Sequence, residues 1–326
     1  MVNKSLTTIN FFAPIQDLLA GVETRMHSQA DRHHPELGAA LEHLLSSGGK
    51  RIRPAVALLT GGMLGANSDQ LVTLGAAIEL LHTATLVHDD FIDGSLMRRG
   101  IATLNAQWSP AATILTGDFI FARAAKLAAE TNSVEVMQLF AETLSSIVNG
   151  EITQMFTRNG QISRSEYEQR IYAKTASMFV LATGAAAILS PVEDRVIERS
   201  RSFGYEIGMA FQIVDDILDF TSEQATIGKP VASDLRQGII TLPAIIFIEM
   251  YPDDPDMASL LNGNRRDTTA IERLITGIRQ SGAIQRAMEE AQQYVGRALD
   301  TLDHMPDNPD RRALQELAEY IVQRSL

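Results

Sequence analysis

The pattern Asp-Asp-x-x-Asp occurs twice in this chain of 326 residues, each time toward the end of a long apolar stretch. The first copy, in HDDFID, is Asp89 to Asp93, and the second, in VDDILD, is Asp215 to Asp219. Carboxylates at the end of a stretch that reads as a buried helix cost free energy unless a cation compensates their charge. The fold must therefore bring cations to both motifs.

The spacing within each motif indicates which cation this is. Its first and last carboxylates are four residues apart, so in a helix they project from one face and can bind the same ion. Oxygen ligands without histidine or thiolate favour Mg²⁺ or Mn²⁺ over zinc, and Mg²⁺ is usually held by one or two carboxylates together with substrate phosphates. A solvated helix end would explain one copy, but two copies on two apolar helices point to a bound metal and a diphosphate. Neither copy has the glycine and final glutamate of an EF-hand loop.

The rest of the chain is predicted to be helical, because alternating β-branched segments are nearly absent. The helix Ser68–His88 is apolar on every side, which is typical of a central helix. Further helices are expected at Pro110–Ala129, Ser133–Phe156, Ser163–Leu189, Pro191–Phe220, Leu242–Glu249, Thr268–Ser281, Ile284–Asp303 and Asp310–Gln323. Loops are expected at Arg98–Ile101, Asn159–Ser163, Thr226–Gly238 and Tyr251–Asn264. We predict one all-α domain over residues 1–326, with ten or more helices.

Composition narrows the function classes. Lysine and arginine number 28 against 40 acidic residues, so a net charge of −12 argues against nucleic acid as a partner. The absence of cysteine excludes disulfides, thiolate metal sites and a cysteine nucleophile. The N-terminal segment lacks the apolar core of a signal peptide, and no uninterrupted apolar run reaches about 18 residues. We therefore expect a soluble cytoplasmic protein with no stable membrane insertion.

Basic residues that could bind phosphate stand in four segments: GGKRIRP, MRRG, YAKTA and IGKP. Guanidinium and ammonium groups complement the phosphate oxygens that a metal leaves free. Together these segments predict two polyphosphate sites, one metal-bound and one held by basic side chains alone. His82 lies almost two helical turns before Asp89 and nearly on its face, so it is either a ligand-binding residue or a core histidine. The basic residues are Lys50, Arg51, Arg53, Arg98, Arg99, Lys174 and Lys229.

Six segments, in this order and spacing, resemble those of the trans-isoprenyl diphosphate synthases, or polyprenyl synthetases. They are GGKRIRP, LLHTATLVHDDFIDGSLMRRG, YAKTA, FQIVDDILDF, GKPVASD and TLP. The resemblance is strong over about residues 40 to 245 and rests on helical character elsewhere. It implies the isoprenoid synthase fold, a helical bundle around a large central cavity with the active site between the two motifs, and a homodimer. One departure is Ile239, where many family members have lysine.

The resemblance also implies a role for each matching residue. Three Mg²⁺ ions (or Mn²⁺) would be bound directly by Asp89, Asp93 and Asp215, with Asp90, Asp216 and Asp219 in support. Arg98, Lys174 and Lys229 match residues that bind the allylic diphosphate. Lys50, Arg53, His82 and Arg99 match the isopentenyl diphosphate pocket, in which Arg51 takes part only in some members. Thr175 and Gln212 match groups whose dipoles face the developing carbocation.

The implied reaction is a condensation of isopentenyl diphosphate with an allylic diphosphate. The allylic C–O bond ionises, the double bond of isopentenyl diphosphate attacks, and a proton is lost, so no protein nucleophile is needed. In this family a bulky aromatic four or five residues before the first aspartate stops growth early, whereas Thr85 and Ala84 are small. The helix extends roughly 30 Å below Asp89. We therefore expect a C30–C50 product, with Phe119, Phe121 or Phe140 as candidates for the floor of the tunnel.

Four alternative functions are compared with the sequence. A geranylgeranyl diphosphate synthase shares the chemistry and differs in the product. A terpene cyclase would not need GGKRIRP for a second diphosphate. A non-catalytic subunit of a heteromeric synthase would generally have lost one or both aspartate motifs, and this chain has both. A purely structural helical scaffold leaves the paired acids and the matching cations unexplained.

Overall fold

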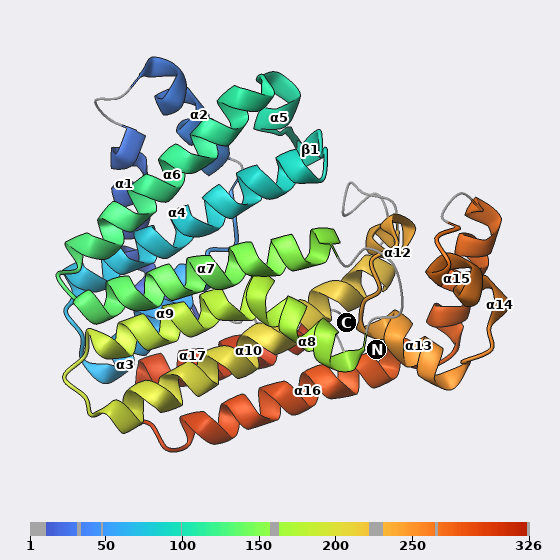
Figure 1. The fold of residues 1–326 in the computed structure, drawn as a ribbon. Coiled ribbons are helices and arrows are strands. Elements are labelled where there is room, and N and C mark those ends of the chain that lie inside the picture. The colour runs from blue at the N-terminus through green and yellow to red at the C-terminus, as the bar shows by residue number, and fades with distance from the viewer. Residues whose placement is uncertain are drawn as a thin grey trace, which may run out of the picture.

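The computed structural model describes residues 11–30, 34–46, 48–98, 100–156, 163–221, 231–264 and 267–324. Helices fill most of this part of the chain (Figure 1). The first half contains η1 (Ala13–Ile15), α1 (Gln16–His27), η2 (Ser28–Ala30), α2 (Pro35–Ser46), α3 (Ile52–Leu64), α4 (Ser68–Ile92), α5 (Leu104–Gln107), α6 (Pro110–Glu130) and α7 (Val134–Phe156). The second half contains α8 (Arg164–Ile171), η3 (Tyr172–Ala176), α9 (Ser177–Ile188), α10 (Asp194–Thr221), α12 (Ser233–Gln237), α13 (Leu242–Met250), α14 (Pro255–Leu261), α15 (Thr268–Gln280), α16 (Ala283–Leu302) and α17 (Pro309–Gln323).

The central helix α4 begins at a well-defined cap. The Asn67 side chain accepts hydrogen bonds from the backbone N–H groups of Asp69 and Gln70, which the helix cannot satisfy internally. The helix then packs against α6 along its length and also against α1, α3 and α9 (Figure 1). It ends at Ile92, one turn beyond the predicted end at His88. The first aspartate motif is therefore part of the helix.

The predicted helix Ser163–Leu189 is present, but η3 interrupts it with a π-helical turn. Such turns are rare, and they are often found at functional sites. Two glycines allow neighbouring helices to come close to η3. A Cβ atom at Gly150 of α7 would lie 2.6 Å from the Cβ of Ala173, and one at Gly208 of α10 would lie 2.6 Å from the Cα of Ala176. The π-helical turn is thus held between α7 and α10.

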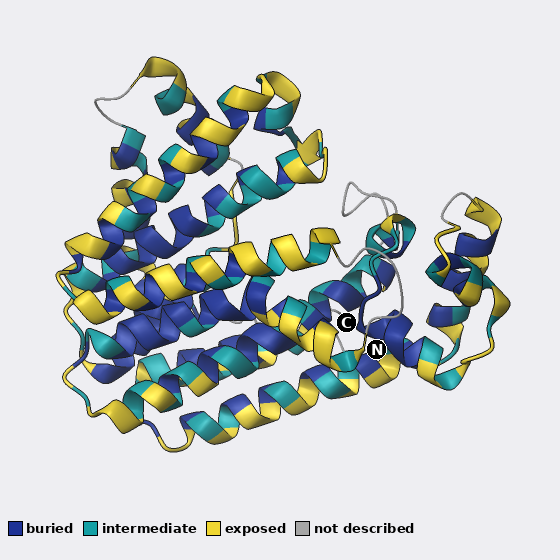
Figure 2. Cartoon of the chain, in the orientation of Figure 1, coloured by how far each residue is buried: buried dark blue, intermediate teal, exposed yellow. Residues whose placement is uncertain are grey.

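One hydrophobic core extends from Phe11 to Ile321. Figure 2 shows that α9 is mostly buried, whereas α7 and α16 each present an exposed outer face. Two helical stretches, Ser68–Ile92 and Arg164–Ile188, have the length and composition of a membrane span. However, 72% and 78% of their most apolar windows are buried inside the protein, which is also typical of core helices.

The all-α prediction is confirmed, with small local differences. The ends of the predicted loop Arg98–Ile101 belong to two paired antiparallel strands, β1 (Met97–Arg98) and β2 (Ile101–Ala102). The predicted loop Tyr251–Asn264 contains α14, which the Asp254 side chain caps and Pro255 begins. Three helices that were not predicted, α1, α2 and α3, precede Ser68.

Candidate active site

The first aspartate motif lies at the end of α4, where cations meet it. Asp90 is 6% exposed and accepts hydrogen bonds from Nε of Arg98, on β1, at 2.9 Å to both carboxylate oxygens. The Nζ atom of Lys174, on η3, lies 3.7 Å from Oδ2 of Asp89. Burial raises the pKa of Asp89 to about 6; Lys174 opposes this shift, and the charges of Glu151 and Asp93 add to it. The third acid, Asp93, is the exposed C-cap.

The second motif lies near the end of α10, and neutral donors hold its most buried acid. Asp216 is 3% exposed and accepts hydrogen bonds at 2.8 Å from the hydroxyl of Tyr167 and from Nε2 of Gln212. Burial raises the pKa of Asp216 to about 7, and the charge of Asp234 adds to the shift, whereas the two hydrogen bonds oppose it. Asp219 accepts the backbone N–H groups of Ser233 and Asp234, so it fixes the start of α12.

Asp215 has a cationic partner that the sequence analysis did not include. Nη2 of Arg324 lies 2.8 Å from Oδ1 of Asp215 and donates to the carbonyl oxygen of Phe211, also at 2.8 Å. The guanidinium lies 3.9 Å from the centroid of the Phe211 ring. Arg324 immediately follows the last predicted helix, and no motif in the sequence marks it as different from a surface charge.

The π-helical turn η3 links the two motifs. The hydroxyl of Thr175 donates to Oε1 of Gln212 at 2.6 Å, and Gln212 in turn donates to Asp216 of the second motif. The preceding residue, Lys174, faces Asp89 of the first motif. Lys174 therefore contacts the first motif directly, and Thr175 is linked to the second through Gln212, so η3 connects predicted site residues of α4 and α10.

Glu151 of α7 also belongs to this site, although the sequence analysis did not include it. Its Oε1 atom accepts a hydrogen bond from Nζ of Lys174 at 2.9 Å, closer than Asp89 does. Burial lowers the pKa of Lys174, but the negative charges of Asp89 and Glu151 raise it by more, so the pKa lies above its ordinary value. In the sequence, Glu151 is marked only by its position directly after Gly150. In the structure, Gly150 is the point where α7 approaches η3.

The predicted isopentenyl diphosphate pocket is partly assembled. Nη1 of Arg53 lies 3.3 Å from Nε2 of His82, and its guanidinium lies 5.3 Å from the ring centroid of Phe179. The ammonium of Lys50 lies 5.9 Å from the ring of Tyr320, on α17. Both Arg99 and Lys229 lie outside the described residues.

The neighbouring Arg51 has a different role. It pairs with Glu23 and with Glu79, whose Oε1 lies 2.9 Å from Nη1 of Arg51, and only 14% of the Arg51 side chain is exposed. Its backbone has a φ of +49°, a left-handed conformation that non-glycine residues seldom adopt. This conformation at the start of α3 accompanies ion pairs with α1 and α4, so Arg51 connects these three helices.

The residues considered for product length differ in burial and in their position relative to the first motif. Ala84 is fully buried, and the hydroxyl of Thr85 bonds to the carbonyl of His82 at 2.7 Å. Phe121 stacks on His88 with ring centroids 5.2 Å apart, so it lies level with the first motif. Phe119 is two residues away on the same helix and is partly buried against the core. Phe140 is 2% exposed and precedes Glu151 by 11 residues, about 16 Å of helix.

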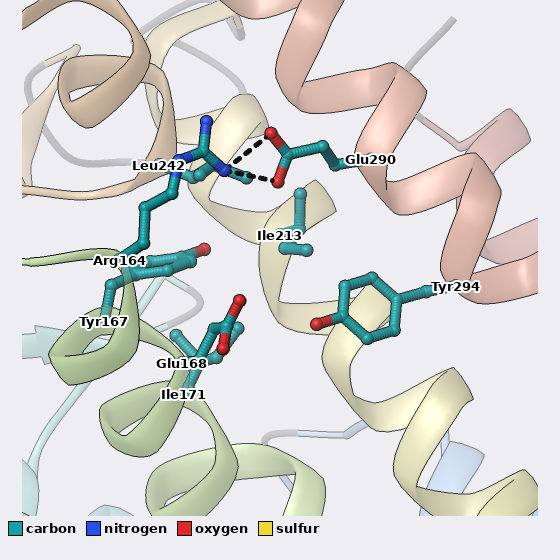
Figure 3. Close-up of a pocket in the computed structure, with 8 residues that line it drawn as sticks. All are labelled: Arg164, Tyr167, Glu168, Ile171, Ile213, Leu242, Glu290 and Tyr294. Atoms are coloured by element: carbon teal, nitrogen blue, oxygen red, sulfur yellow. Dashed lines mark hydrogen bonds and ion pairs between the residues drawn. The ribbon is translucent and has the colours of Figure 1, made fainter. Parts of the chain in front are cut away.

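A small pocket lies behind the second motif, between α8, α10, α13 and α16 (Figure 3). Tyr167 lines it and also donates to Asp216. On one side, Nη1 of Arg164 binds both carboxylate oxygens of Glu290, and on the other Tyr294 points inward (Figure 3). The lining also includes Glu168, Ile171, Ile213 and Leu242, and its one cation, Arg164, is paired with Glu290, so the pocket differs from a diphosphate site.

The donor set at the two motifs fits magnesium, because it consists of carboxylate oxygens without imidazole or thiolate. Within the ranges that the structure describes, no three acidic, histidine or cysteine side chains converge on one point. The acids are instead paired with Arg98, Lys174, Arg324, Gln212 and Tyr167. A site that is completed by substrate phosphates needs only one or two carboxylates for each ion.

The chain matches one protein family and several known proteins along most of its length. The family model "Polyprenyl synthetase" matches residues 34–278. The chain is 36% identical to heptaprenyl diphosphate synthase component 2 of Geobacillus stearothermophilus, over 95% of this chain and 97% of the relative. The crystal structure of heptaprenyl diphosphate synthase from Staphylococcus aureus is 34% identical, with a TM-score of 0.91 over 96% of this chain and 99% of that one. A polyprenyl synthase from Caulobacter crescentus CB15, complexed with calcium and isoprenyl diphosphate, is 33% identical, with a TM-score of 0.90 over 97% of each chain.

Proposed function

Because this chain belongs to the polyprenyl synthetase family, we propose that it condenses isopentenyl diphosphate with an allylic diphosphate in the head-to-tail trans sense, giving a C30–C50 polyprenyl diphosphate. The observation that carries this proposal is that the adjacent residues Lys174 and Thr175 link the two aspartate motifs, Lys174 by its contact with Asp89 and Thr175 through Gln212, which donates to Asp216. A diphosphate bound beside Lys174 would lie between the two groups of carboxylates. That is the arrangement that ionisation of an allylic diphosphate requires.

Magnesium is the metal that these acids suit, and we propose three ions. Asp89, Asp93 and Asp215 would be direct ligands, and Asp90, Asp216 and Asp219 would orient them or act through water. The bound ions would supply positive charge that stabilises the diphosphate as a leaving group. The calcium and isoprenyl diphosphate named for the C. crescentus structure support a cation and a diphosphate in such a fold.

The side chains of the protein would perform the remaining steps. Lys174, Arg98 and Lys229 would bind the allylic diphosphate. Thr175 and Gln212 would direct their oxygen dipoles at the developing allylic cation. The contact between Arg53 and His82 supports a second pocket, in which they, Lys50 and Arg99 hold isopentenyl diphosphate. Positioning of the two substrates would allow the double bond to attack, and the departing diphosphate would accept the proton.

A long product follows from the depth of the large side chains. Ala84 and Thr85, which precede the first motif on α4, are small, and the aromatic Phe121 lies level with the motif. We therefore propose Phe140 as the floor of the elongation tunnel, with Ala84 and Thr85 keeping the upper part open. The names of the heptaprenyl synthases among the relatives support a product longer than C20.

We also propose a cytoplasmic homodimer. The described parts of α6 and α7 expose large apolar side chains that a second copy of the chain would cover: Ile114, Leu115, Val134, Val148, Ile152, Met155 and Phe156. The relative named "component 2" raises the alternative of a heteromeric enzyme with another subunit. Light scattering of the purified chain distinguishes these states: a monomer that gains activity only when another protein is added would favour the heteromer.

The direct test of the reaction is a product assay. Purified protein is incubated with Mg²⁺, isopentenyl diphosphate and farnesyl diphosphate, and the dephosphorylated products are sized. We expect a ladder that ends at C30 or longer. A stop at C20 would retain the chemistry and refute the assignment of the floor to Phe140, whereas no product with any allylic primer would contradict catalysis by this chain alone.

A further inference from the structure

Lys174 stands between two carboxylates on two different helices. Its Nζ atom is 2.9 Å from Oε1 of Glu151 on α7 and 3.7 Å from Oδ2 of Asp89 on α4. The nearer carboxylate belongs to an acid outside both aspartate motifs. All three side chains are partly accessible, with 39% of Lys174, 17% of Glu151 and 15% of Asp89 exposed.

The backbone enforces the shorter contact. The close approach at Gly150 and Ala173 leaves no room for a side chain, and it places the next residue of α7, Glu151, beside the next residue of η3, Lys174. Without Glu151, the ammonium would be left with Asp89 as its nearest carboxylate. A lysine in direct contact with Asp89 would compete with a metal ion for the same oxygen atoms, because both interactions are electrostatic.

We propose that Glu151 is a positioning residue that keeps the Lys174 ammonium beyond hydrogen-bond distance of Asp89, so that the Asp89 carboxylate stays available for a divalent cation until a diphosphate draws Lys174 to itself. This inference rests on the proposed function, since it takes Asp89 as a metal ligand. It adds a residue from outside both motifs and assigns to it a step that precedes the chemistry. In this view Glu151 touches neither the metal nor the substrate.

The test measures binding of a cation without turnover. Free Mn²⁺ is followed by electron paramagnetic resonance while it is titrated into the full-length protein in the presence of inorganic pyrophosphate. Glu151→Gln keeps the shape of the side chain and removes its charge, so we expect Mn²⁺ affinity to fall about 5-fold. Glu142→Gln removes a charge from an exposed position on the same helix and should leave the affinity unchanged.

A second background separates positioning from the general effect of a negative charge. In Lys174→Met there is no ammonium to hold, so adding Glu151→Gln should change Mn²⁺ affinity by less than twofold. An equal loss in both backgrounds would overturn the proposal, because Glu151 would then act as a ligand or through its field. Unchanged affinity in Glu151→Gln alone would also overturn it.

Two further results complete the design. Glu151→Asp should recover part of the affinity, because the flexible lysine can follow a shorter carboxylate, whereas a variant that merely disturbed packing would show no such recovery. The melting temperature of each variant is measured alongside. If the unsubstituted protein bound no Mn²⁺ with pyrophosphate, the proposed metal site itself would be wrong, which is distinct from a failure confined to Glu151.

Discussion

The two aspartate motifs have the same sequence pattern and different surroundings. At the first, on the last turn of α4, two of the acids face the charged side chains of Arg98 and Lys174, and Asp93 is exposed. At the second, on α10, only Asp215 pairs with a cation, Arg324, among the described residues, whereas Asp216 is buried among neutral donors and Asp219 accepts backbone N–H groups of α12. The first motif can thus exchange its partners for metal and substrate, whereas much of the second is fixed by the fold.

Substitution of a direct metal ligand should have the largest effect on activity, and the loss should be of similar size at both motifs. Asp89→Ala and Asp215→Ala each remove a proposed ligand, so each should lower kcat/KM about 10³-fold, since metal stabilisation of the leaving group is worth several kcal/mol. Product formation from radiolabelled isopentenyl diphosphate measures this loss. Circular dichroism provides the control for folding. A loss of kcat/KM in only one of the two variants would contradict the proposal that both aspartates bind catalytic metal ions.

The pH dependence of stability should distinguish the two motifs. In the metal-free protein the pKa values of Asp89 (about 6) and Asp216 (about 7) lie above their ordinary value of 3.8. The folded state therefore binds more protons than the unfolded state between about pH 4 and these values, so stability contributed by the protonated groups is lost as pH rises. For Asp89 the loss is about 3 kcal/mol.

Asparagine variants isolate each contribution, because the amide does not titrate. In urea unfolding from pH 4 to 8, the free energy of unfolding of Asp89→Asn relative to the unsubstituted protein should rise with pH up to about pH 6. The same difference for Asp216→Asn should rise up to about pH 7. A difference that does not change with pH for either variant would contradict the burial that we assign to that acid.

The neutral support of the second motif should contribute more to stability than to catalysis. Tyr167→Phe removes the hydroxyl that donates to buried Asp216, and at pH 8 it should lower the free energy of unfolding by about 1–3 kcal/mol. Tyr172→Phe, at a more exposed tyrosine on η3, is the matched control. If the two variants unfolded at the same urea concentration, Tyr167 would not support the motif as described.

The smallest effect should come from the link between the motifs. Thr175→Val keeps the shape of the side chain and removes its hydrogen bond to Gln212, so kcat should fall about 10-fold while KM for isopentenyl diphosphate stays nearly constant. Steady-state kinetics with each substrate varied in turn measures both quantities. A rise in the KM for isopentenyl diphosphate without a change in kcat would instead indicate that Thr175 helps to bind isopentenyl diphosphate.

Sequence reasoning predicted the elements that carry a local signal. Helical periodicity marked α4, α6, α7, α10, α16 and α17 within a few residues. The predicted helix Pro191–Phe220 contained Asp215 and Asp216, whereas Asp89 and Asp90 lie in the last turn of α4, beyond its predicted end at His88. The start of α14 has its own signal, Asp254 followed by Pro255, which the prediction of a loop overlooked.

The residues that were missed depend on contacts between distant parts of the chain. By sequence, Glu151 and Tyr167 are ordinary helix residues and Arg324 is an ordinary residue after a helix. Only the packing of α7, α8 and α17 against η3 and α10 brings them to the acids. Arg51 shows the converse, because its motif predicted a phosphate contact, and the fold pairs it with Glu23 and Glu79. Spacing identifies groups that act together on one element, whereas partners on other elements need the structure.

The most direct test of the central claim is a crystal structure of this protein with Mn²⁺ and a non-reacting allylic thiodiphosphate, with the metal located by anomalous scattering. The account predicts Mn²⁺ peaks bound to Asp89 and Asp93 and to Asp215, on one diphosphate that lies against Lys174. Metal at only one motif, or a diphosphate bound away from Lys174, would contradict the claim that the two motifs form a single site.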